Sequence, residues 1–169
     1  MSRRRADDPS FRRSSIGLGV DVHRFSDDPE RVLVLGGTPL PGERGLEGHS
    51  DADVIAHACA DALLGAARLG DLGEHFPDTD PRWAGADSLD LLREVVRLVL
   101  GDGWEIDNVD CTVMLEAPKL APHRALMVSA LSDVVGAPVH VKATRAEHLG
   151  AIGRGEGVVC WAVALVTSA

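Results

Sequence analysis

Length, composition and charge already exclude several classes of protein. The chain has 169 residues, 45% of them hydrophobic and 25% charged, which is the composition of one globular domain rather than of a disordered or fibrous chain. A formal net charge of −9 disfavours binding to nucleic-acid phosphates, and no apolar run is long enough to cross a bilayer. We therefore expect neither a nucleic acid nor a membrane as partner.

The first 15 residues differ in composition from the rest of the chain. They contain five arginines and no apolar segment of the kind that an export signal carries. We expect residues 1–15 to form a disordered extension and residues 16–169 to form one domain. Cys59, Cys111 and Cys160 have no metal-binding or disulfide spacing, so we expect buried, reduced thiols and a cytoplasmic location.

Strands and helices alternate along the domain, which predicts an α/β (α+β layered) fold with a mixed sheet packed by helices. We expect strands at 16–22, 31–35, 106–115, 139–143 and 158–166. We expect helices at 52–64 with Ser50 as its cap, from Asp87 or Ser88 onward, and from the prolines at 118 and 122 to about Val135. Residues 38–48 and 70–86 are predicted loops, and a loop as long as the second is usually functional.

The first of these strands ends with a possible pair of metal ligands. Asp21 and His23 are two residues apart, so on a strand their side chains point to the same face. Either His49 or His57 could complete a zinc site with three protein ligands and one open position. Asp61, one turn after His57, could then orient the second ring nitrogen of that imidazole. The pair alone fits equally well a strand end whose side chains hydrogen-bond to a turn.

Other polar clusters are open to two interpretations. Gly17 and Gly19 lie inside a strand and have no third glycine at the right spacing, which excludes a dinucleotide-binding loop. The acidic residues of the 70–86 loop could bind polyol hydroxyls or could cap turns. Lys119 could meet a phosphate and Glu147 a hard cation, or both could be ordinary surface charges.

Taken in order, the motifs of the chain form a pattern that covers nearly everything from residue 16 to the end. They are G-x-G-x-D-V-H-R-F at 17–25, L-G-G at 35–37, G-L-E-G-H-S-D-A-D at 45–53, H-A-x-x-D-A-L-L-G-A-A at 57–67, G-D-L-G-x-x-F-P-D-T-D-P at 70–81, G-A-D-S at 85–88, N-V-D at 108–110, E-A-P-K at 116–119, V-K-A-T at 141–144 and G-R-G-E-G at 153–157. This pattern resembles the 2-C-methyl-D-erythritol 2,4-cyclodiphosphate synthases of the non-mevalonate isoprenoid pathway. The resemblance implies a homotrimer with active sites between subunits. It also implies a phosphorus–oxygen lyase that converts 4-diphosphocytidyl-2-C-methyl-D-erythritol 2-phosphate into a cyclic diphosphate and CMP.

The resemblance also implies a role for particular residues. The implied zinc ligands are Asp21, His23 and His57, and the implied catalytic residues are His49 and Arg145. The implied substrate-binding residues are Ser50 for a phosphate; Asp71, Leu72, Gly73, Phe76, Pro77, Asp78, Thr79 and Asp80 for the methylerythritol; Ala117, Pro118, Lys119 and Thr144 for the cytidine; Glu147 for magnesium or manganese on the diphosphate; and Arg154 near the three-fold axis.

Four positions depart from the usual pattern of the family. Arg145 replaces a threonine that is implied to stabilise the transition state, and it is followed by Ala146. Ala151 replaces a phenylalanine near the axis, and Glu116 replaces the glutamine before A-P-K. These departures leave two alternatives open: a paralogue that acts on another nucleotide-diphosphate substrate, or a catalytically weak trimeric protein that binds an isoprenoid-like ligand.

Overall fold

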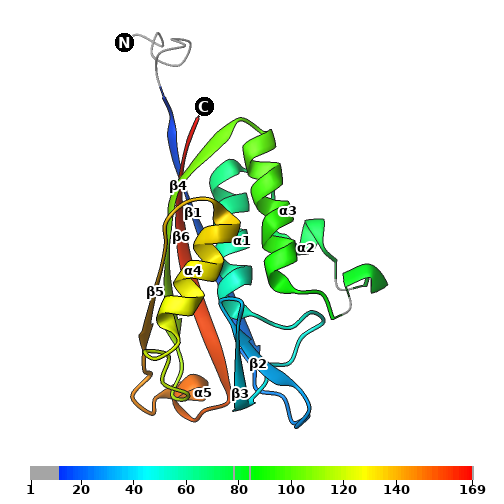
Figure 1. The fold of residues 1–169 in the computed structure, drawn as a ribbon, viewed down its shortest axis with the longest axis vertical. Helices are drawn as coiled ribbons and strands as arrows, with labels where there is room; N and C mark the ends of the chain where they lie inside the picture. The colour runs from blue at the N-terminus through cyan, green and yellow to red at the C-terminus, as the bar shows by residue number, and fades with distance from the viewer. Residues whose placement is uncertain (1–11, 78, 84, 169) are drawn as a thin grey trace.

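The fold combines one four-stranded sheet with a layer of helices on one of its faces (Figure 1). The computed structural model describes residues 12–77, 79–83 and 85–168. The strand order is β1-β6-β4-β5, with antiparallel pairs β1–β6 and β6–β4 and a parallel pair β4–β5. The strands are β1 (Ser14–Arg24), β4 (Trp104–Met114), β5 (Val139–Thr144) and β6 (Gly157–Ser168). The expected mixed sheet is thus confirmed.

The first strand begins two residues before the domain boundary that the sequence suggested. Ser14 belongs to β1, and the Arg12 guanidinium lies 2.9 Å from a Glu105 carboxylate oxygen. The rest of the expected disordered extension, residues 1–11, lies outside the described residues.

Three helices form the layer that covers the sheet. They are α1 (Val54–Ala67), α3 (Ser88–Gly101) and α4 (Arg124–Val135). Helix α1 packs on β1 and β6, α4 packs on β5, and α3 lies against α1 and α4. Two single-turn helices, α2 (Leu72–His75) and α5 (Gly150–Gly153), and the 3-10 turn Pro81–Trp83 lie in the connections. None of the helices in the described part of the chain has the length and apolar character that a membrane span requires.

One segment predicted as a loop is a strand. Strands β2 (Val32–Leu35) and β3 (Thr38–Arg44) form a hairpin within the region 31–48. Its two-residue turn, Gly36-Gly37, has φ values of 57° and 69°, the left-handed conformation that tight hairpin turns need. The prolines and glycines of 38–48 resemble loop residues, but a proline is tolerated in an edge strand of a two-stranded ribbon.

The start of α1 also differs from the prediction. Asp53, not Ser50, is the N-cap, and the Asp53 carboxylate accepts hydrogen bonds from the backbone N–H groups of Ile55 and Ala56. The same carboxylate accepts from Gly36 and Gly37 at 2.8 and 2.6 Å, so it ties the hairpin turn to the helix. Asp53 is fully buried, and these four bonds satisfy it.

Two glycines allow α1 to lie directly on β1. A Cβ atom at Gly17 would lie 1.9 Å from the Ala62 carbonyl oxygen, and one at Gly19 would lie 2.0 Å from that of Ala58. Any side chain at either position would push the helix away from the strand. The glycines therefore set the spacing between β1, which carries Asp21 and His23, and α1, which carries His57.

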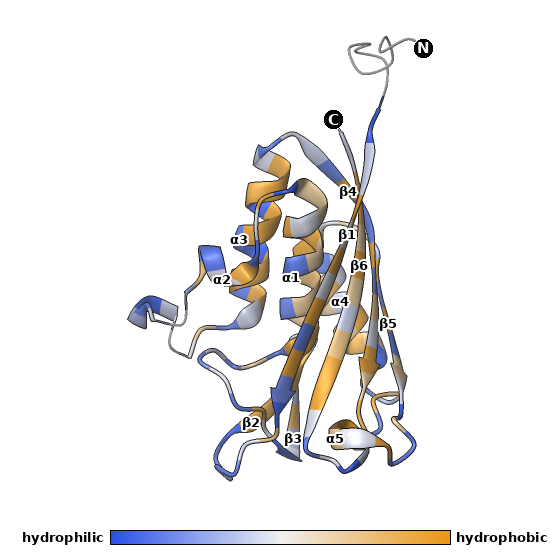
Figure 2. Cartoon of the chain, turned by 180° about the vertical axis from the view of Figure 1, so that it is seen from behind, coloured by the Kyte–Doolittle hydropathy of each residue, from blue (hydrophilic) through white to orange (hydrophobic). Residues whose placement is uncertain are grey.

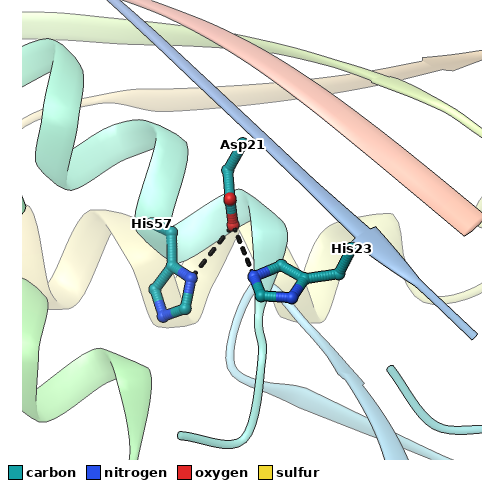
Figure 3. Close-up of side chains that lie close together, drawn as sticks. All are labelled: Asp21, His23 and His57. Atoms are coloured by element: carbon teal, nitrogen blue, oxygen red, sulfur yellow. Dashed lines mark hydrogen bonds and ion pairs between the residues drawn. The ribbon is translucent and has the colours of Figure 1, made fainter. Parts of the chain in front are cut away.

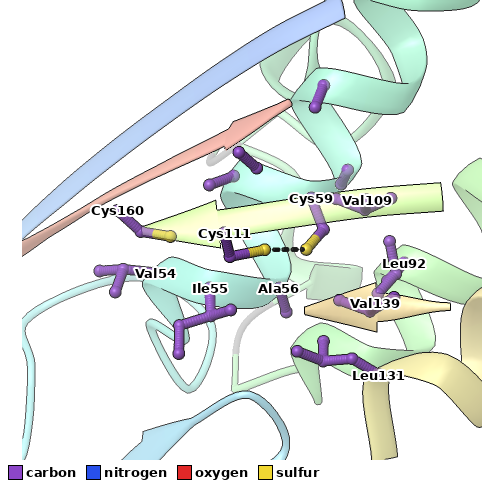
Figure 4. Close-up of a cluster of buried hydrophobic side chains, with 14 of the residues drawn as sticks. Val54, Ile55, Ala56, Cys59, Leu92, Val109, Cys111, Leu131, Val139 and Cys160 are labelled. Atoms are coloured by element: carbon purple, nitrogen blue, oxygen red, sulfur yellow. Dashed lines mark hydrogen bonds between the residues drawn. The ribbon is translucent and has the colours of Figure 1, made fainter. Parts of the chain in front are cut away.

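The cysteines lie in the core between the sheet and α1, as predicted (Figure 4). All three are free and fully buried, and the sulfur atoms of Cys59 and Cys111 are 3.3 Å apart. They therefore pack as small apolar groups.

The opposite face of the sheet carries exposed apolar side chains. On β1 these are Ile16, Leu18, Val20 and Val22, with 46 to 69% of their surface accessible, and Val163 on β6 is 43% accessible. Figure 2 views the molecule from this side and shows hydrophobic residues along both strands. Exposed apolar side chains gathered in a row are typical of surfaces that bind another molecule.

Candidate active site

Three side chains from strand β1 and helix α1 converge on one another (Figure 3). One oxygen of the Asp21 carboxylate, Oδ2, lies 3.1 Å from Nε2 of His23 and 3.0 Å from Nδ1 of His57. The three residues offer ligand atoms that all lie within 4.8 Å of one another. Their side chains are only 12 to 23% exposed. Two imidazole nitrogens and one carboxylate oxygen are the kind of donor set that can hold a metal ion and leave one position open.

The triad is electrostatically coupled. Burial raises the pKa of Asp21, but hydrogen bonds from His23 and His57 outweigh burial and hold that pKa well below its usual range. Burial lowers the pKa of His23, but the hydrogen bond and negative charge of Asp21 outweigh it and raise that pKa above its usual value. The carboxylate therefore stays charged near neutral pH and attracts a cation.

In each imidazole, the ring nitrogen that does not face Asp21, called the outer nitrogen below, also has a partner. His23 Nδ1 contacts the backbone carbonyl of Glu47. His57 Nε2 lies 2.9 Å from the Ser88 hydroxyl and 3.2 Å from the Ser50 hydroxyl. The prediction that Asp61 orients His57 is wrong. The Asp61 carboxylate instead accepts the backbone N–H of Leu72 at 2.8 Å, because α2 begins there with an N–H that needs an acceptor.

A cavity of about 320 Å³ lies beside the triad. Its lining residues are His23, Gly48, His49, Ser50, His57, Leu72, Phe76, Trp83 and Leu91. The structure therefore places His49 and Ser50 next to the candidate metal ligands. The Arg31 guanidinium holds their loop by donating to the carbonyls of Gly48 and Ser50 at 2.9 and 2.5 Å.

Residues 71–80, predicted to bind the methylerythritol, are only partly gathered at this cavity. Leu72 and Phe76 line it, whereas Gly73, Pro77 and Thr79 do not. Asp71 caps α2 through the N–H of Glu74, and Asp80 forms an ion pair with Arg82 at 2.6 Å. Asp78 lies outside the described residues.

Sequence reasoning missed one aromatic residue at this cavity. The ring of Trp83 stands edge-on to that of Phe76, with 5.0 Å between centroids, and closes one wall. A tryptophan in a polar loop of a chain with only three tryptophans was the available signal.

A second cavity, of about 300 Å³, gathers most of the residues implied to bind the nucleotide. Its lining includes Pro118, Lys119, Thr144, Arg145 and Glu147. These residues are brought together because β4 and β5 are parallel neighbours that end side by side, with Met114 opposite Thr144. The departing residue Glu116 also lines this cavity, whereas Ala117 does not.

The turn after β5 has an unusual backbone. Glu147 and His148 both have positive φ values, 51° and 64°, although neither is glycine. The Glu116 carboxylate accepts the backbone N–H of His148 at 3.1 Å and so holds the turn. Backbone strain of this kind gathers at functional sites.

Arg154 lies apart from both cavities. Its guanidinium forms an ion pair with Glu156 at 2.6 Å and lines a hollow of about 530 Å³ with Arg24, Phe25 and Arg44. The metal-side and nucleotide-side cavities share no lining residue. The predicted functional residues thus form separate groups within one chain.

Fold and site together define an α/β enzyme domain with a candidate metal centre at a helix–sheet junction. The model of the YgbB family matches residues 14–167, and the chain belongs to this family. A relative from Symbiobacterium thermophilum, named 2-C-methyl-D-erythritol 2,4-cyclodiphosphate synthase, is 54% identical over 154 residues, which cover 89% of this chain and 97% of the relative. The chain is an enzyme of this synthase family, which comprises phosphorus–oxygen lyases of isoprenoid biosynthesis.

Solved structures show the same relationship. The CDP complex of IspF from Plasmodium falciparum is 31% identical, with a TM-score of 0.80 over 94% of this chain and 99% of that one. A CDP-bound form of a 2C-methyl-D-erythritol-2,4-cyclodiphosphate synthase is 40% identical, with a TM-score of 0.80 over 89% of this chain and 99% of the other.

Proposed function

We propose that the chain converts 4-diphosphocytidyl-2-C-methyl-D-erythritol 2-phosphate into 2-C-methyl-D-erythritol 2,4-cyclodiphosphate and CMP. An oxygen of the 2-phosphate attacks the β-phosphorus of the diphosphate, the bond from that phosphorus to the bridging oxygen breaks, and CMP leaves with that oxygen. The observation that carries the proposal is the convergence of Asp21, His23 and His57 beside His49 and Ser50.

The three ligands fit a zinc ion, because zinc in catalytic sites takes three nitrogen or oxygen donors and keeps one position open. When bound there, zinc supplies a Lewis acid that neutralises charge on phosphate oxygens. His49 and Ser50 hold the same phosphate from the loop that Arg31 fixes. Positioning and charge neutralisation supply most of the catalysis in phosphoryl transfer, so the protein needs no covalent intermediate.

The second cavity is suited to the other end of the substrate. Lys119 and Arg145 bring positive charge to a diphosphate, and Glu147 would hold a magnesium or manganese ion on it. Pro118 and Thr144 would bound the cytidine. Arg145 can stabilise phosphoryl charge in place of the threonine usual in the family, through its planar set of donors.

We further propose a homotrimer with active sites between subunits. Two features support it: the exposed apolar row on β1, and the separation of the two cavities within one subunit. In a ring of subunits, the metal-side cavity of one subunit faces the nucleotide-side cavity of its neighbour.

Phosphorus NMR of the purified protein with the substrate, zinc and magnesium tests the reaction. The expected result is the cyclic diphosphate with one equivalent of CMP. No turnover by a folded, zinc-loaded protein would reject it. The presence of Arg145 in the second cavity would then favour a paralogue that acts on another nucleotide-diphosphate substrate, and Arg145→Thr would be the first reversion to make.

A further inference from the structure

The two histidines of the triad are held differently at their outer nitrogens. The partner of His23 Nδ1 is the Glu47 carbonyl oxygen, which can only accept a hydrogen bond. This carbonyl holds a proton on Nδ1 of His23, so that Nε2, which faces Asp21, can offer its lone pair when a metal ion is bound between them. The partners of His57 Nε2 are the Ser50 and Ser88 hydroxyls, which can either donate or accept. The hydroxyls alone leave the tautomer of His57 undetermined.

A carboxylate behind Ser88 favours one of the two tautomers. The Ser88 hydroxyl donates to Oδ1 of Asp51, and the Ser88 backbone N–H donates to Oδ2 of Asp51 at 3.2 Å. A carboxylate only accepts, so the hydroxyl proton of Ser88 points to Asp51. The Ser88 oxygen is then left as an acceptor for a proton on His57 Nε2. When a metal ion lies between Asp21 and His57, Nδ1 has to offer its lone pair, and the proton has to sit on Nε2, where the Ser88 oxygen accepts it.

The hydrogen bonds that link Asp51 through Ser88 to His57, called the relay below, are buried and are supported by a backbone hydrogen bond. Ser88 is 1% exposed, so water does not compete for its hydroxyl. The backbone N–H of Asp51 donates to the Ala86 carbonyl at 3.1 Å, which fastens the loop before α1 to the residues before α3. The relay therefore links His57 on α1 to Ser88, the first residue of α3, and to the loop that carries Ser50.

We propose that Asp51 is a positioning residue of the metal centre, which acts through Ser88 to keep the proton of His57 on Nε2 and the lone pair of Nδ1 free for the metal. The inference rests on the metal-binding part of the proposed function. A hydrogen-bond acceptor at the outer nitrogen raises the basicity of the liganding one, and loss of such a partner typically costs roughly 10–100-fold in metal affinity.

The test is Asp51→Asn, measured with zinc ion alone by competition against a chelator and without substrate. The asparagine keeps the size of the side chain but has one acceptor oxygen for the two Ser88 donors. With that oxygen on the backbone N–H of Ser88, the amide NH2 faces the hydroxyl, which turns toward His57, and the His57 proton moves to Nδ1. We expect zinc affinity to fall by roughly 10–100-fold. Asp90→Asn is the matched control, because Asp90 lies exposed on the same helix as Ser88 and pairs only with Arg93 among the described residues. It should leave zinc affinity unchanged.

Two further measurements separate the relay from a merely structural role. Ser88→Ala combined with Asp51→Asn should cost no more affinity than Ser88→Ala alone, because both changes break one chain. Long-range proton–nitrogen NMR of the zinc-loaded wild type should show the His57 proton on Nε2 and zinc on Nδ1, a readout that needs no variant to fold.

Three outcomes would overturn the inference: the opposite tautomer in the wild type, zinc affinity of Asp51→Asn within twofold of the control, or losses from the two single variants that multiply. A wild type that binds zinc through Nδ1 but makes no cyclic diphosphate would reject the proposed function and leave the relay standing. If the wild type is fully active and Asp51→Asn binds zinc as tightly as the wild type does, the relay alone is rejected.

Discussion

At the metal-side cavity, every imidazole and carboxylate of the triad has a short contact to another protein group, and the supporting hydroxyls are almost fully buried. At the nucleotide-side cavity, Lys119, Thr144, Arg145 and Glu147 are exposed. The first site is fixed by helix and strand, whereas the second is formed by the ends of two parallel strands and a turn. Under the proposed function, this difference predicts that the metal side tolerates little change and that the nucleotide side tolerates more. The departures at Glu116 and Arg145 both fall on the second side.

The sharpest test of this contrast is His57→Ala. We expect loss of bound zinc and a fall in turnover of about 10²–10³-fold or more, because a major source of charge stabilisation disappears. His140→Ala, on an exposed position of β5, should change neither. Turnover and metal content of purified protein are the measurements, and a fully active His57→Ala variant would remove the metal assignment.

The tight packing near the metal-side cavity leads us to expect a difference in stability between two helix caps. Asp53→Ala should lower the free energy of unfolding by about 2–4 kcal/mol, because it removes a cap and leaves buried N–H groups of the hairpin turn unpaired. Asp87→Ala removes the exposed cap of α3, which accepts only from Leu89 among the described residues, and should cost about 1 kcal/mol. Urea unfolding compares the two, and equal losses would contradict the contrast.

The shifted pKa of Asp53 predicts that the free energy of unfolding depends on pH. Burial raises its pKa from 3.8 to about 6, although hydrogen bonds from Gly37 and Gly36 oppose the shift. Between these values the folded state binds the proton more than the unfolded state does. The contribution of Asp53 to stability is therefore highest below about pH 4, falls as the pH rises to 6 and is constant above that. The stability difference between wild type and Asp53→Asn, measured from pH 4 to 7, should follow this curve, and a difference independent of pH would refute it.

The nucleotide-side cavity should tolerate substitution with little loss of activity. Arg145→Thr is expected to alter kcat/KM by less than about tenfold, since one exposed phosphate contact is worth about 1 kcal/mol, and to leave zinc affinity unchanged. Arg145 forms no ion pair within the described part of the chain, so its removal breaks none. Steady-state kinetics provides the test, and a loss of a hundredfold or more would show that this side is as constrained as the other.

The smallest effect is expected at the turn after β5. Glu116→Gln keeps an oxygen for the N–H of His148, whereas Glu116→Ala removes it and releases two residues from positive φ. Only the alanine variant should raise KM, by a few-fold, with kcat and zinc affinity kept. Equal KM values for the two variants would show that Glu116 does not hold the turn.

The sequence predicted the strand pair Asp21 and His23 because alternation along a strand is a local rule. It could not choose between His49 and His57 without the family resemblance, since that choice depends on how α1 lies on β1. The hairpin at 38–44 was missed because Pro39 and the glycines around it suit loops and edge strands alike. The Asp51–Ser88–His57 chain was not predictable, because it joins three segments whose proximity arises only from packing.

The glycines at 17 and 19 have a consequence for redesign of the site. Backbone rests on backbone at both contacts, so no rotamer change can absorb an added methyl group. The separation of Asp21 from His57 therefore depends on two positions of β1 that carry no side chain. An engineer who wants the centre to accept a larger ion has to begin with these glycines, not with the ligands.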